Sequence, residues 1–169
     1  MSVSDFESLV SQQGRRVLSL AMRVVGNADL AQDVHQEVFL RVWRRWDRLN
    51  GHTHWDRYLY RATVRTALDT ARRLRQTSSL ADTADEAAAP GTTSDAQIRV
   101  DELRRELTRC LTKLPRRQAE VFILARLEGM EHDAIAACLE CSPRTVRVHL
   151  HRAMKRLAHE LDGFLGAQS

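Results

Sequence analysis

The chain has 169 residues, which suffices for one ordinary domain or for two small helical ones. Its formal net charge is +4 and 43% of its residues are hydrophobic, so we expect a packed core. No apolar run approaches about 18 residues, which excludes a membrane span, and the first residues lack the basic and apolar parts of a signal peptide. The three cysteines make no disulfide framework. Together these features predict a cytoplasmic protein.

The charge is unevenly distributed along the chain. Residues 1–76 carry a net charge of +5 and residues 98–169 carry +3, whereas residues 77–97 carry −4. Two basic blocks are typical of a protein that binds nucleic acid, because phosphates supply most of the sequence-independent affinity of such complexes.

Apolar residues recur at helical spacing and predict an all-α protein that begins with helices over residues 5–25, 29–49 and 54–76. Gly26 and Asn27 are expected to end the first helix. The side chains expected to face the core from the second helix are Leu30, Val34, Val38, Phe39, Val42, Trp43, Trp46 and Leu49.

Residues 77–97 differ from the rest of the chain. They are small, polar and acidic and have no apolar period, which is typical of a flexible linker. Further helices are expected over residues 97–113 and from Leu114–Pro115 to Leu127. The sequence therefore predicts two small helical domains, residues 1–76 and residues 98–169.

The most informative stretch begins at Ser142, where an N-cap serine and Pro143 at the first helical position predict the start of a helix. Residues 131–139 are expected to form a shorter helix just before it, with a tight turn between the two. The apolar side of the longer helix carries Val146, Leu150, Ala153 and Leu157. Its other side carries Arg144, Arg147, Arg152, Lys155 and Arg156. Two short helices of which the second is basic describe a helix-turn-helix, so this protein is expected to read DNA.

The second expected helix carries Asp29, Asp33, Glu37, Arg41 and Arg45 at intervals of four residues. Such a row fits a solvated face with acids near the N-terminus and bases near the C-terminus. A surface for a partner protein would show the same spacing, but from the spacing alone we favour the solvated face, because charged helix faces are usually just solvated.

The third expected helix is rich in arginine, and histidines precede it. Arginines beside exposed aromatic side chains suit single-stranded or distorted DNA, whose bases are open to stacking. The other interpretation is a solvated basic face, with Trp55 and Tyr58 in the core, and for these two side chains we favour the core. The arginines are Arg57, Arg61, Arg65, Arg72, Arg73 and Arg75.

Cys138 and Cys141 form a lone CxxC pair. A structural zinc ion needs four ligands, and we expect both cysteines to act as small apolar residues instead. No glycine-rich phosphate loop, nucleophile elbow or apolar carboxylate pair is present. We therefore expect no enzyme, no cofactor and no metal.

Three stretches, taken in order, resemble a bacterial RNA polymerase sigma factor of the extracytoplasmic-function type. Residues 30–44 read LAQDVHQEVFLRVWR, residues 58–73 read YLYRATVRTALDTARR, and residues 114–130 read LPRRQAEVFILARLEGM. The resemblance implies that residues 1–76 are sigma region 2, that residues 77–97 are a linker, and that residues 98–169 are sigma region 4.

The resemblance also implies partners and site residues. Region 2 would dock on the clamp helices of core RNA polymerase through Asp33, Gln36, Glu37 and Arg41. It would melt and read the minus-ten promoter element through Asn50, His52, His54, Arg57, Arg61, Arg65 and Arg72. Region 4 would dock on the polymerase flap and read the minus-thirty-five element through Arg144, Thr145, Arg147, Val148, His149, His151 and Arg152, with Arg116 and Arg117 on phosphates. An anti-sigma factor and a regulatory kinase are the other partners considered.

The chain departs from the family pattern at several positions. Two acids of the docking stretch are replaced by Leu30 and Gln32, and phosphorylation of Thr53 or Thr63 would restore negative charge there. Glu140 stands where the turn usually has glycine, which adopts a left-handed conformation more readily.

Two other functions stay open from the sequence. One is a free-standing helix-turn-helix regulator that binds duplex DNA without polymerase. The other is a helical interaction module whose cationic faces are merely solvated. Binding to core polymerase would distinguish a sigma factor from the free-standing regulator. A strong salt dependence of DNA binding would argue against the interaction module.

Overall fold

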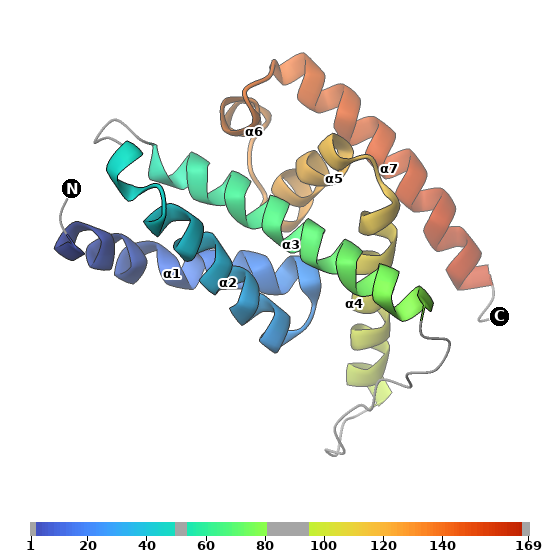
Figure 1. Ribbon diagram of the computed structural model, residues 1–169. Helices are drawn as coiled ribbons and strands as arrows, with labels where there is room; N and C mark the ends of the chain where they lie inside the picture. Colours follow the sequence, from blue (N-terminus) through green and yellow to red (C-terminus); the bar gives the residue numbers. More distant parts are fainter. Residues whose placement is uncertain (1–2, 50–53, 81–94, 167–169) are drawn as a thin grey trace.

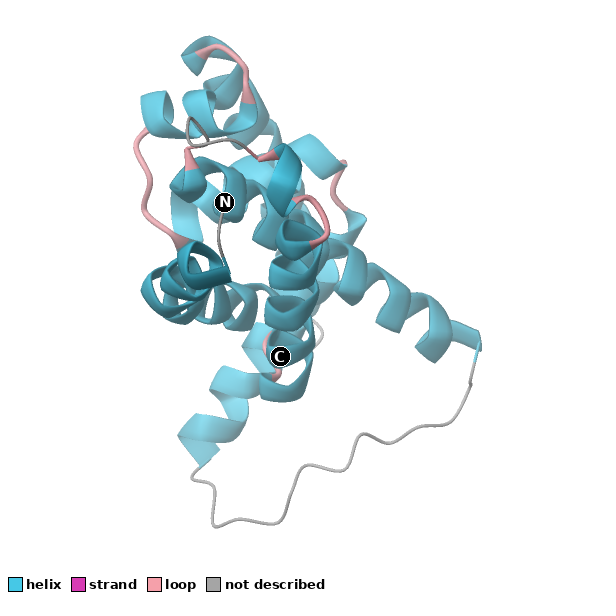
Figure 2. Cartoon of the chain, turned by 60° about the vertical axis from the view of Figure 1, so that its left-hand side comes forward, coloured by secondary structure: helices cyan, strands magenta, loops and turns pink. Residues whose placement is uncertain are grey.

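The computed structural model describes residues 3–49, 54–80 and 95–166. Within these ranges all regular structure is helical, as the sequence predicted (Figures 1 and 2). None of the helices described is long and apolar enough to cross a membrane.

Three helices pack against one another and form the first part of the molecule, here called the N-lobe. They are α1 (Val3–Val25), α2 (Ala28–Trp43) and α3 (Trp55–Leu80). Gly26, at φ +68°, ends α1, and the side chain of Asn27 accepts a hydrogen bond of 3.0 Å from the Leu30 N–H at the start of α2. The break predicted between the first two helices is therefore confirmed.

The second helix is shorter than the sequence suggested. After Trp43 the chain turns into the short 3₁₀ helix η1 (Trp46–Arg48). Phe39 and Trp46 are buried as expected, and Trp46 stacks on Trp55 with 5.3 Å between ring centroids. Trp43 itself is the last residue of α2 and faces outward: it is 44% exposed, and its ring lies 4.9 Å from that of Phe6, centroid to centroid. The prediction that Trp43 faces the core was wrong, because Trp43 directly follows buried Val42 on the helix and so lies beside the buried stripe of α2, not in it.

The remaining helices form the second part, here called the C-lobe. They are α4 (Asp95–Lys113), α5 (Arg116–Phe122), the π-helical turn η2 (Ile123–Leu127), α6 (His132–Leu139) and α7 (Pro143–Gly166). The predicted helix ending at Leu127 is thus α5 followed by η2, in which the Glu128 N–H reaches back to the Ile123 carbonyl at 3.1 Å. The apolar stripe expected in α7 is buried, namely Val146, Leu150, Ala153 and Leu157.

Both ends of the segment expected to be a linker are helical. The last turn of α3 runs to Leu80, and α4 starts at Asp95. The rest of that segment lies outside the described residues.

The two lobes touch along α3, which contacts α4, α5 and α6 (Figure 1). Hydrogen bonds also join α1 to the C-lobe. The Thr108 hydroxyl donates to the Val24 carbonyl at 3.1 Å, and Arg23 donates to the Leu127 carbonyl at 3.1 Å. As a result, the helix that carries most of the predicted minus-ten residues faces the other lobe.

Candidate nucleic-acid interface

The turn of the helix-turn-helix contains a residue in the left-handed conformation. Glu140, at φ 55° and ψ 53°, follows the end of α6. The Cys141 N–H then donates to the Ala136 carbonyl at 3.0 Å, which closes the helix end. Glycine adopts this conformation without cost, whereas a side chain strains it. The backbone of Glu140 therefore has the geometry expected of the turn, but this conformation is strained because the residue is not glycine.

Ser142 caps α7 as predicted. Its hydroxyl accepts a hydrogen bond of 3.1 Å from the Thr145 N–H, and the two hydroxyl groups lie 2.8 Å apart. The Thr145 hydroxyl is therefore part of the cap, and its availability to DNA is reduced.

The outer face of α7 is open to solvent. Arg144, Arg147, Val148, His151 and Arg152 are exposed. His149 is half-buried, and its Nδ1 is buried with no hydrogen-bond partner in the part of the chain that the structure describes. None of the acids described pairs with the three arginines of this face. Their guanidinium groups are therefore available to bind phosphates or bases.

The α3 arginines lie in a different setting, because they contact the C-lobe. Arg61 forms an ion pair with Glu140, and this hydrogen bond holds the pKa of the Glu140 carboxyl below its ordinary value. Arg72 donates to the carbonyls of Thr112, in the last turn of α4, and of Leu114, just after it, at 3.3 and 3.0 Å. These carbonyls are left without partners where a helix ends, so a cation stabilises them.

Glu120 in α5 is the point at which arginines from both lobes meet. Its carboxylate is 1% exposed. From α3, Arg65 Nε reaches it at 3.0 Å. From α5 itself, Arg116 Nε and Arg117 each reach it at 3.3 Å. Arg116 also lies 3.5 Å from Asp69 of α3. A buried carboxylate needs such partners, and here they come from sites that the sequence assigned to two different promoter elements.

The start of α3 carries the remaining minus-ten candidates. His54 and Arg57 are exposed and line an open hollow of about 250 Å³ against α6. Asn50 and His52 lie outside the described residues. Trp55 and Tyr58 are half-buried and pack edge to face at 6.1 Å between centroids, which agrees with the interpretation that they belong to the core.

The cysteines behave as small apolar residues. Cys138 is buried, and its burial raises the pKa of the thiol. A raised pKa keeps the sulfur protonated and unreactive. Cys141 is half-buried, and the described residues contain no cluster of ligands that could hold a metal ion.

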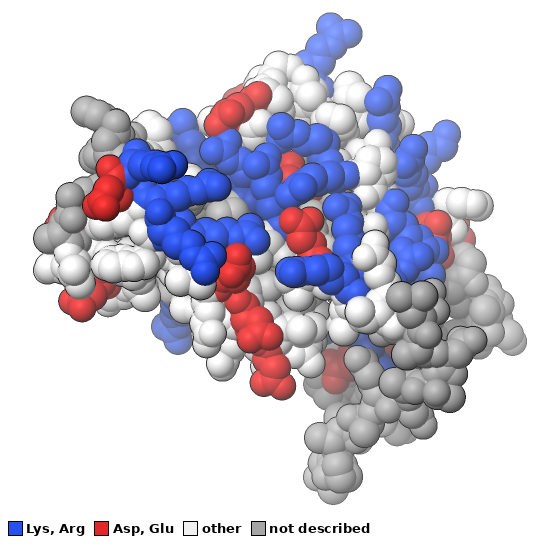
Figure 3. Space-filling model, viewed as in Figure 1, with Lys and Arg blue, Asp and Glu red and all other residues white. Residues whose placement is uncertain are grey.

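Basic side chains gather on one face of the molecule, over α3 and the helices on either side of it, around a hollow (Figure 3). A concave basic surface concentrates anions by focusing the electrostatic field. The arrangement as a whole therefore favours a polyanionic partner.

Comparison with known proteins agrees with this geometry. Residues 9–77 match the family model described as Sigma-70 region 2, and residues 104–157 match the one described as Sigma-70, region 4. The chain belongs to the sigma-70 family.

The relatives of this sigma factor place it in the extracytoplasmic-function (ECF) group. It is 32% identical over 155 residues to the RNA polymerase sigma factor CarQ of Myxococcus xanthus, an alignment that covers 90% of this chain and 86% of that one. It is 29% identical to the ECF RNA polymerase sigma-E factor of Escherichia coli K12, over 92% of this chain and 86% of that one. The fold resembles that of the sigma factor RpoE of Bartonella quintana, solved in complex with the anti-sigma factor NepR, at a TM-score of 0.59 and 20% identity over 95% of this chain and 98% of that one.

The α2 surface of the sigma factor combines polar and apolar side chains. Asp33 and Gln36 are exposed, while Glu37 is half-buried and accepts a hydrogen bond of 2.6 Å from Arg41. Leu40 and Trp43 extend the same stripe and are 42% and 44% exposed. Sequence reasoning missed these two as surface residues, although the signal was available: Leu40 follows Gln36 by four residues and Trp43 follows Leu40 by three.

One proposed modification site is wrong. Thr63 lies in the middle of α3 and is fully buried, so a kinase has no access to its hydroxyl. Thr53 lies outside the described residues.

Replacing Glu140 by glycine should stabilise the C-lobe. We expect E140G to raise the Tm by about 2–4 °C, because it removes a left-handed side chain. The matched control is E140A, which loses the same ion pair with Arg61 but keeps the strain. Thermal unfolding followed by circular dichroism measures both, and an E140G variant no more stable than E140A would contradict the assignment.

Replacing Glu120 by glutamine should weaken the contact between the lobes. We expect a loss of about 1–2 kcal/mol in the free energy of unfolding, less than for a fully buried pair because water screens the three half-exposed arginines. Urea unfolding measures it. The control is E102Q, the same change at an exposed position of α4, and equal stability of the two variants would refute the role of Glu120.

Proposed function

We propose that the N-lobe of this sigma factor docks on core RNA polymerase and reads the minus-ten element, and that the C-lobe reads the minus-thirty-five element. The observation that carries the proposal is the open basic face of α7, which is the second helix of the helix-turn-helix and is capped by Ser142. Such a helix enters the major groove with its first turns against the base edges. In this role the protein is a specificity subunit, and we expect no catalytic activity of its own.

Recognition of the upstream element would rest on a few side chains at the start of α7. Arg144, Arg147 and Arg152 form no ion pair with the acids that the structure describes, and a bidentate contact from arginine to guanine is the commonest specific contact in the major groove. Val148 is exposed and apolar, which suits the methyl group of thymine. Arg116 and Arg117 would fix the register on phosphates.

Given the contacts between the lobes, the arrangement would have to change before both promoter elements are bound. The centres of the two elements lie 25 base pairs apart by their names, which is roughly 85 Å along duplex DNA. Arg65 and Arg116 share one carboxylate in the structure. They are therefore unable to reach both elements at once in this arrangement. We propose that promoter binding opens the lobes and that phosphates replace Glu120 and Glu140 as partners of the arginines.

The chain between the lobes is long enough for such an opening. Fourteen residues separate Leu80 from Asp95, and when fully extended they span at most about 50 Å. Together with the lengths of α3 and α4, this reach lets each lobe bind its own element.

Once the lobes are apart, the α3 arginines would face the non-template strand. Unstacking a base costs a few kilocalories per mole. Contacts of Arg57, Arg61 and Arg65 with the strand, and a pocket for an extruded base near His54, would offset that cost without a nucleotide cofactor.

Docking on the polymerase would use the stripe on α2. Exposed Leu40 and Trp43 follow Asp33 and Gln36 along one stripe of α2, and protein interfaces combine apolar anchors with polar side chains in this way. Because the polymerase and the chromosome are its targets, the protein would act in the cytoplasm. An anti-sigma factor is a proposed inhibitor, by analogy with the Bartonella quintana complex.

The direct test is transcription in vitro with core polymerase and genomic DNA. We expect new start sites when the purified chain is added, and co-purification with core polymerase. Start sites that are the same with and without the chain would refute the proposal. Specific binding of duplex DNA without polymerase would instead favour a free-standing regulator.

Replacing Arg147 should weaken recognition of the minus-thirty-five element only. We expect R147A to weaken binding of the holoenzyme to a promoter by about 1–3 kcal/mol, because it removes a base contact. R15A, an exposed arginine on α1, makes the same charge change and should have no comparable effect. Quantitative footprinting measures both. If the unmodified protein bound intact and scrambled upstream elements equally, the role of Arg147 would be excluded.

Trp43 should anchor the contact with polymerase. We expect W43A and L40A each to raise the Kd for core polymerase by about tenfold, since buried aromatic and aliphatic anchors dominate interface energies. M22A removes an exposed apolar side chain from α1 and is the control. The measurement is fluorescence anisotropy with labelled protein, and unchanged Kd values for both α2 variants would contradict the assignment.

A further inference from the structure

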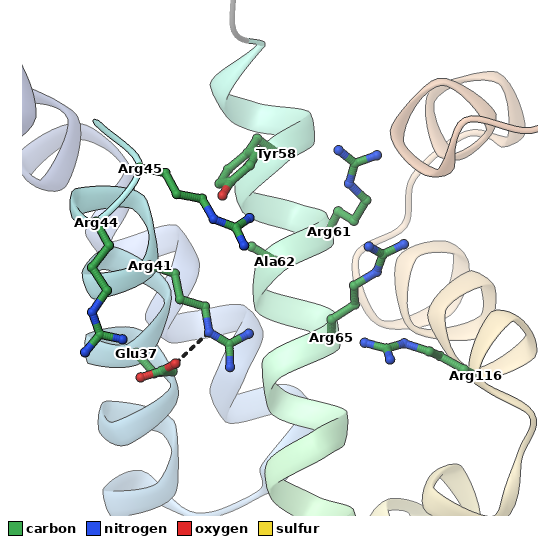
Figure 4. A pocket seen from close by; sticks show the side chains of 9 residues that line it. All are labelled: Glu37, Arg41, Arg44, Arg45, Tyr58, Arg61, Ala62, Arg65 and Arg116. Carbon is green, nitrogen blue, oxygen red and sulfur yellow. Dashed lines mark hydrogen bonds and ion pairs between the residues drawn. The ribbon is translucent and has the colours of Figure 1, made fainter. Parts of the chain in front are cut away.

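An open cavity of about 400 Å³ lies where α2, α3 and α5 meet. Its walls carry six arginines, shown in Figure 4: Arg41, Arg44, Arg45, Arg61, Arg65 and Arg116. Among the described residues of the wall, Glu37 is the only acid. The volume lies within the range of small-molecule sites, which is roughly 300–1,000 Å³.

Four of these arginines already have acidic partners within the protein. Glu37 pairs with Arg41, and Glu140 pairs with Arg61. Glu120 is shared between Arg65 and Arg116. Each of these arginines has further N–H donors beyond the bonds described, because a guanidinium carries five.

The other two arginines have no such partner. In the part of the chain that the structure describes, neither Arg44 nor Arg45 forms a side-chain hydrogen bond or ion pair. Both are exposed, and Arg45 extends from the end of α2 toward α3 (Figure 4). The cavity therefore has an excess of positive charge on more than one wall, and its concave shape strengthens the field.

This arrangement fits an anion with several linked phosphate groups. Guanidinium groups bind phosphate oxygens through paired hydrogen bonds, and they tolerate burial better than ammonium groups. A single phosphate would contact one wall. A chain of phosphates would extend from one wall toward the others, which carry Arg45 beside α2, Arg61 and Arg65 on α3, and Arg116 on α5.

We propose that this cavity binds a small polyphosphate, either inorganic or the phosphate chain of a nucleotide. The site needs both lobes, because Arg116 belongs to the C-lobe and the other five arginines belong to the N-lobe. Bound ligand would hold the lobes together. The inference goes beyond promoter recognition and does not depend on it.

Calorimetric titration of the full chain with inorganic tripolyphosphate, in about 0.15 M salt to suppress nonspecific binding, tests the proposal. We expect saturable binding of one ligand per chain. R45A should weaken it by about tenfold or more, since it removes a charge-assisted contact.

R48A is the matched control. Arg48 lies in η1, is exposed and does not line the cavity, so its replacement should leave the affinity unchanged. Absence of saturable binding would overturn the proposal, and so would equal losses in R45A and R48A. Because no polymerase or promoter is present, this result is independent of the transcription test.

A second titration with adenosine triphosphate distinguishes the source of the phosphates. Tyr58 lines the cavity, and tighter binding of the nucleotide would indicate that a base is also recognised. Equal affinities would assign the site to the phosphate chain alone.

The effect on the lobes is tested by small-angle scattering. Tripolyphosphate should shift the E120Q variant, whose contact between the lobes is weakened, toward the radius of gyration of the unmodified chain. A ligand that binds but leaves the scattering of E120Q unchanged would refute the claim that it holds the lobes together.

Discussion

The buried carboxylate of Glu120 is the interaction on which the arrangement of the two lobes depends. It is 1% exposed and accepts hydrogen bonds from Arg65 of the N-lobe and from Arg116 and Arg117 of the C-lobe. A carboxylate at this depth is costly without partners, and breaking such a set leaves a charge uncompensated. The cluster therefore favours the closed arrangement of the free chain, although its arginines are open enough to water for the energy to remain moderate.

The same arginines would serve two purposes. In the closed chain they neutralise the acids of the protein, and on a promoter they would neutralise phosphates. Because one anionic partner replaces another, the exchange would need little net free energy. Binding to the polymerase and the DNA together would then be sufficient to shift the equilibrium toward the open arrangement. The basic face of α7 needs no such exchange, because none of the acids that the structure describes pairs with its arginines. The α7 surface proposed to read the minus-thirty-five element would thus be preformed, whereas the α3 surface proposed to read the minus-ten element would become available when the lobes open.

Much of the fold was predictable because its signals are local. The Gly26–Asn27 break, the Ser142–Pro143 helix start and the buried stripe of α7 all follow from capping chemistry and helical period. The exposure of Trp43 was missed because its apolar side chain was assigned to the core, although its spacing from Leu40 places both on the outer face of α2. The Arg116–Glu120 spacing is visible in the sequence, whereas the approach of Arg65 depends on tertiary packing of the lobes. The roles of the individual promoter contacts stay predictions.

The distance between the lobes tests this account most directly. Pulsed electron–electron spin resonance between labels at R15C on α1 and H159C on α7, in a chain without its native cysteines, measures it. The account predicts one short, narrow distribution for the free chain and a longer distance in the holoenzyme bound to a promoter. The same distribution in both states, or a broad distribution in the free chain, would contradict it.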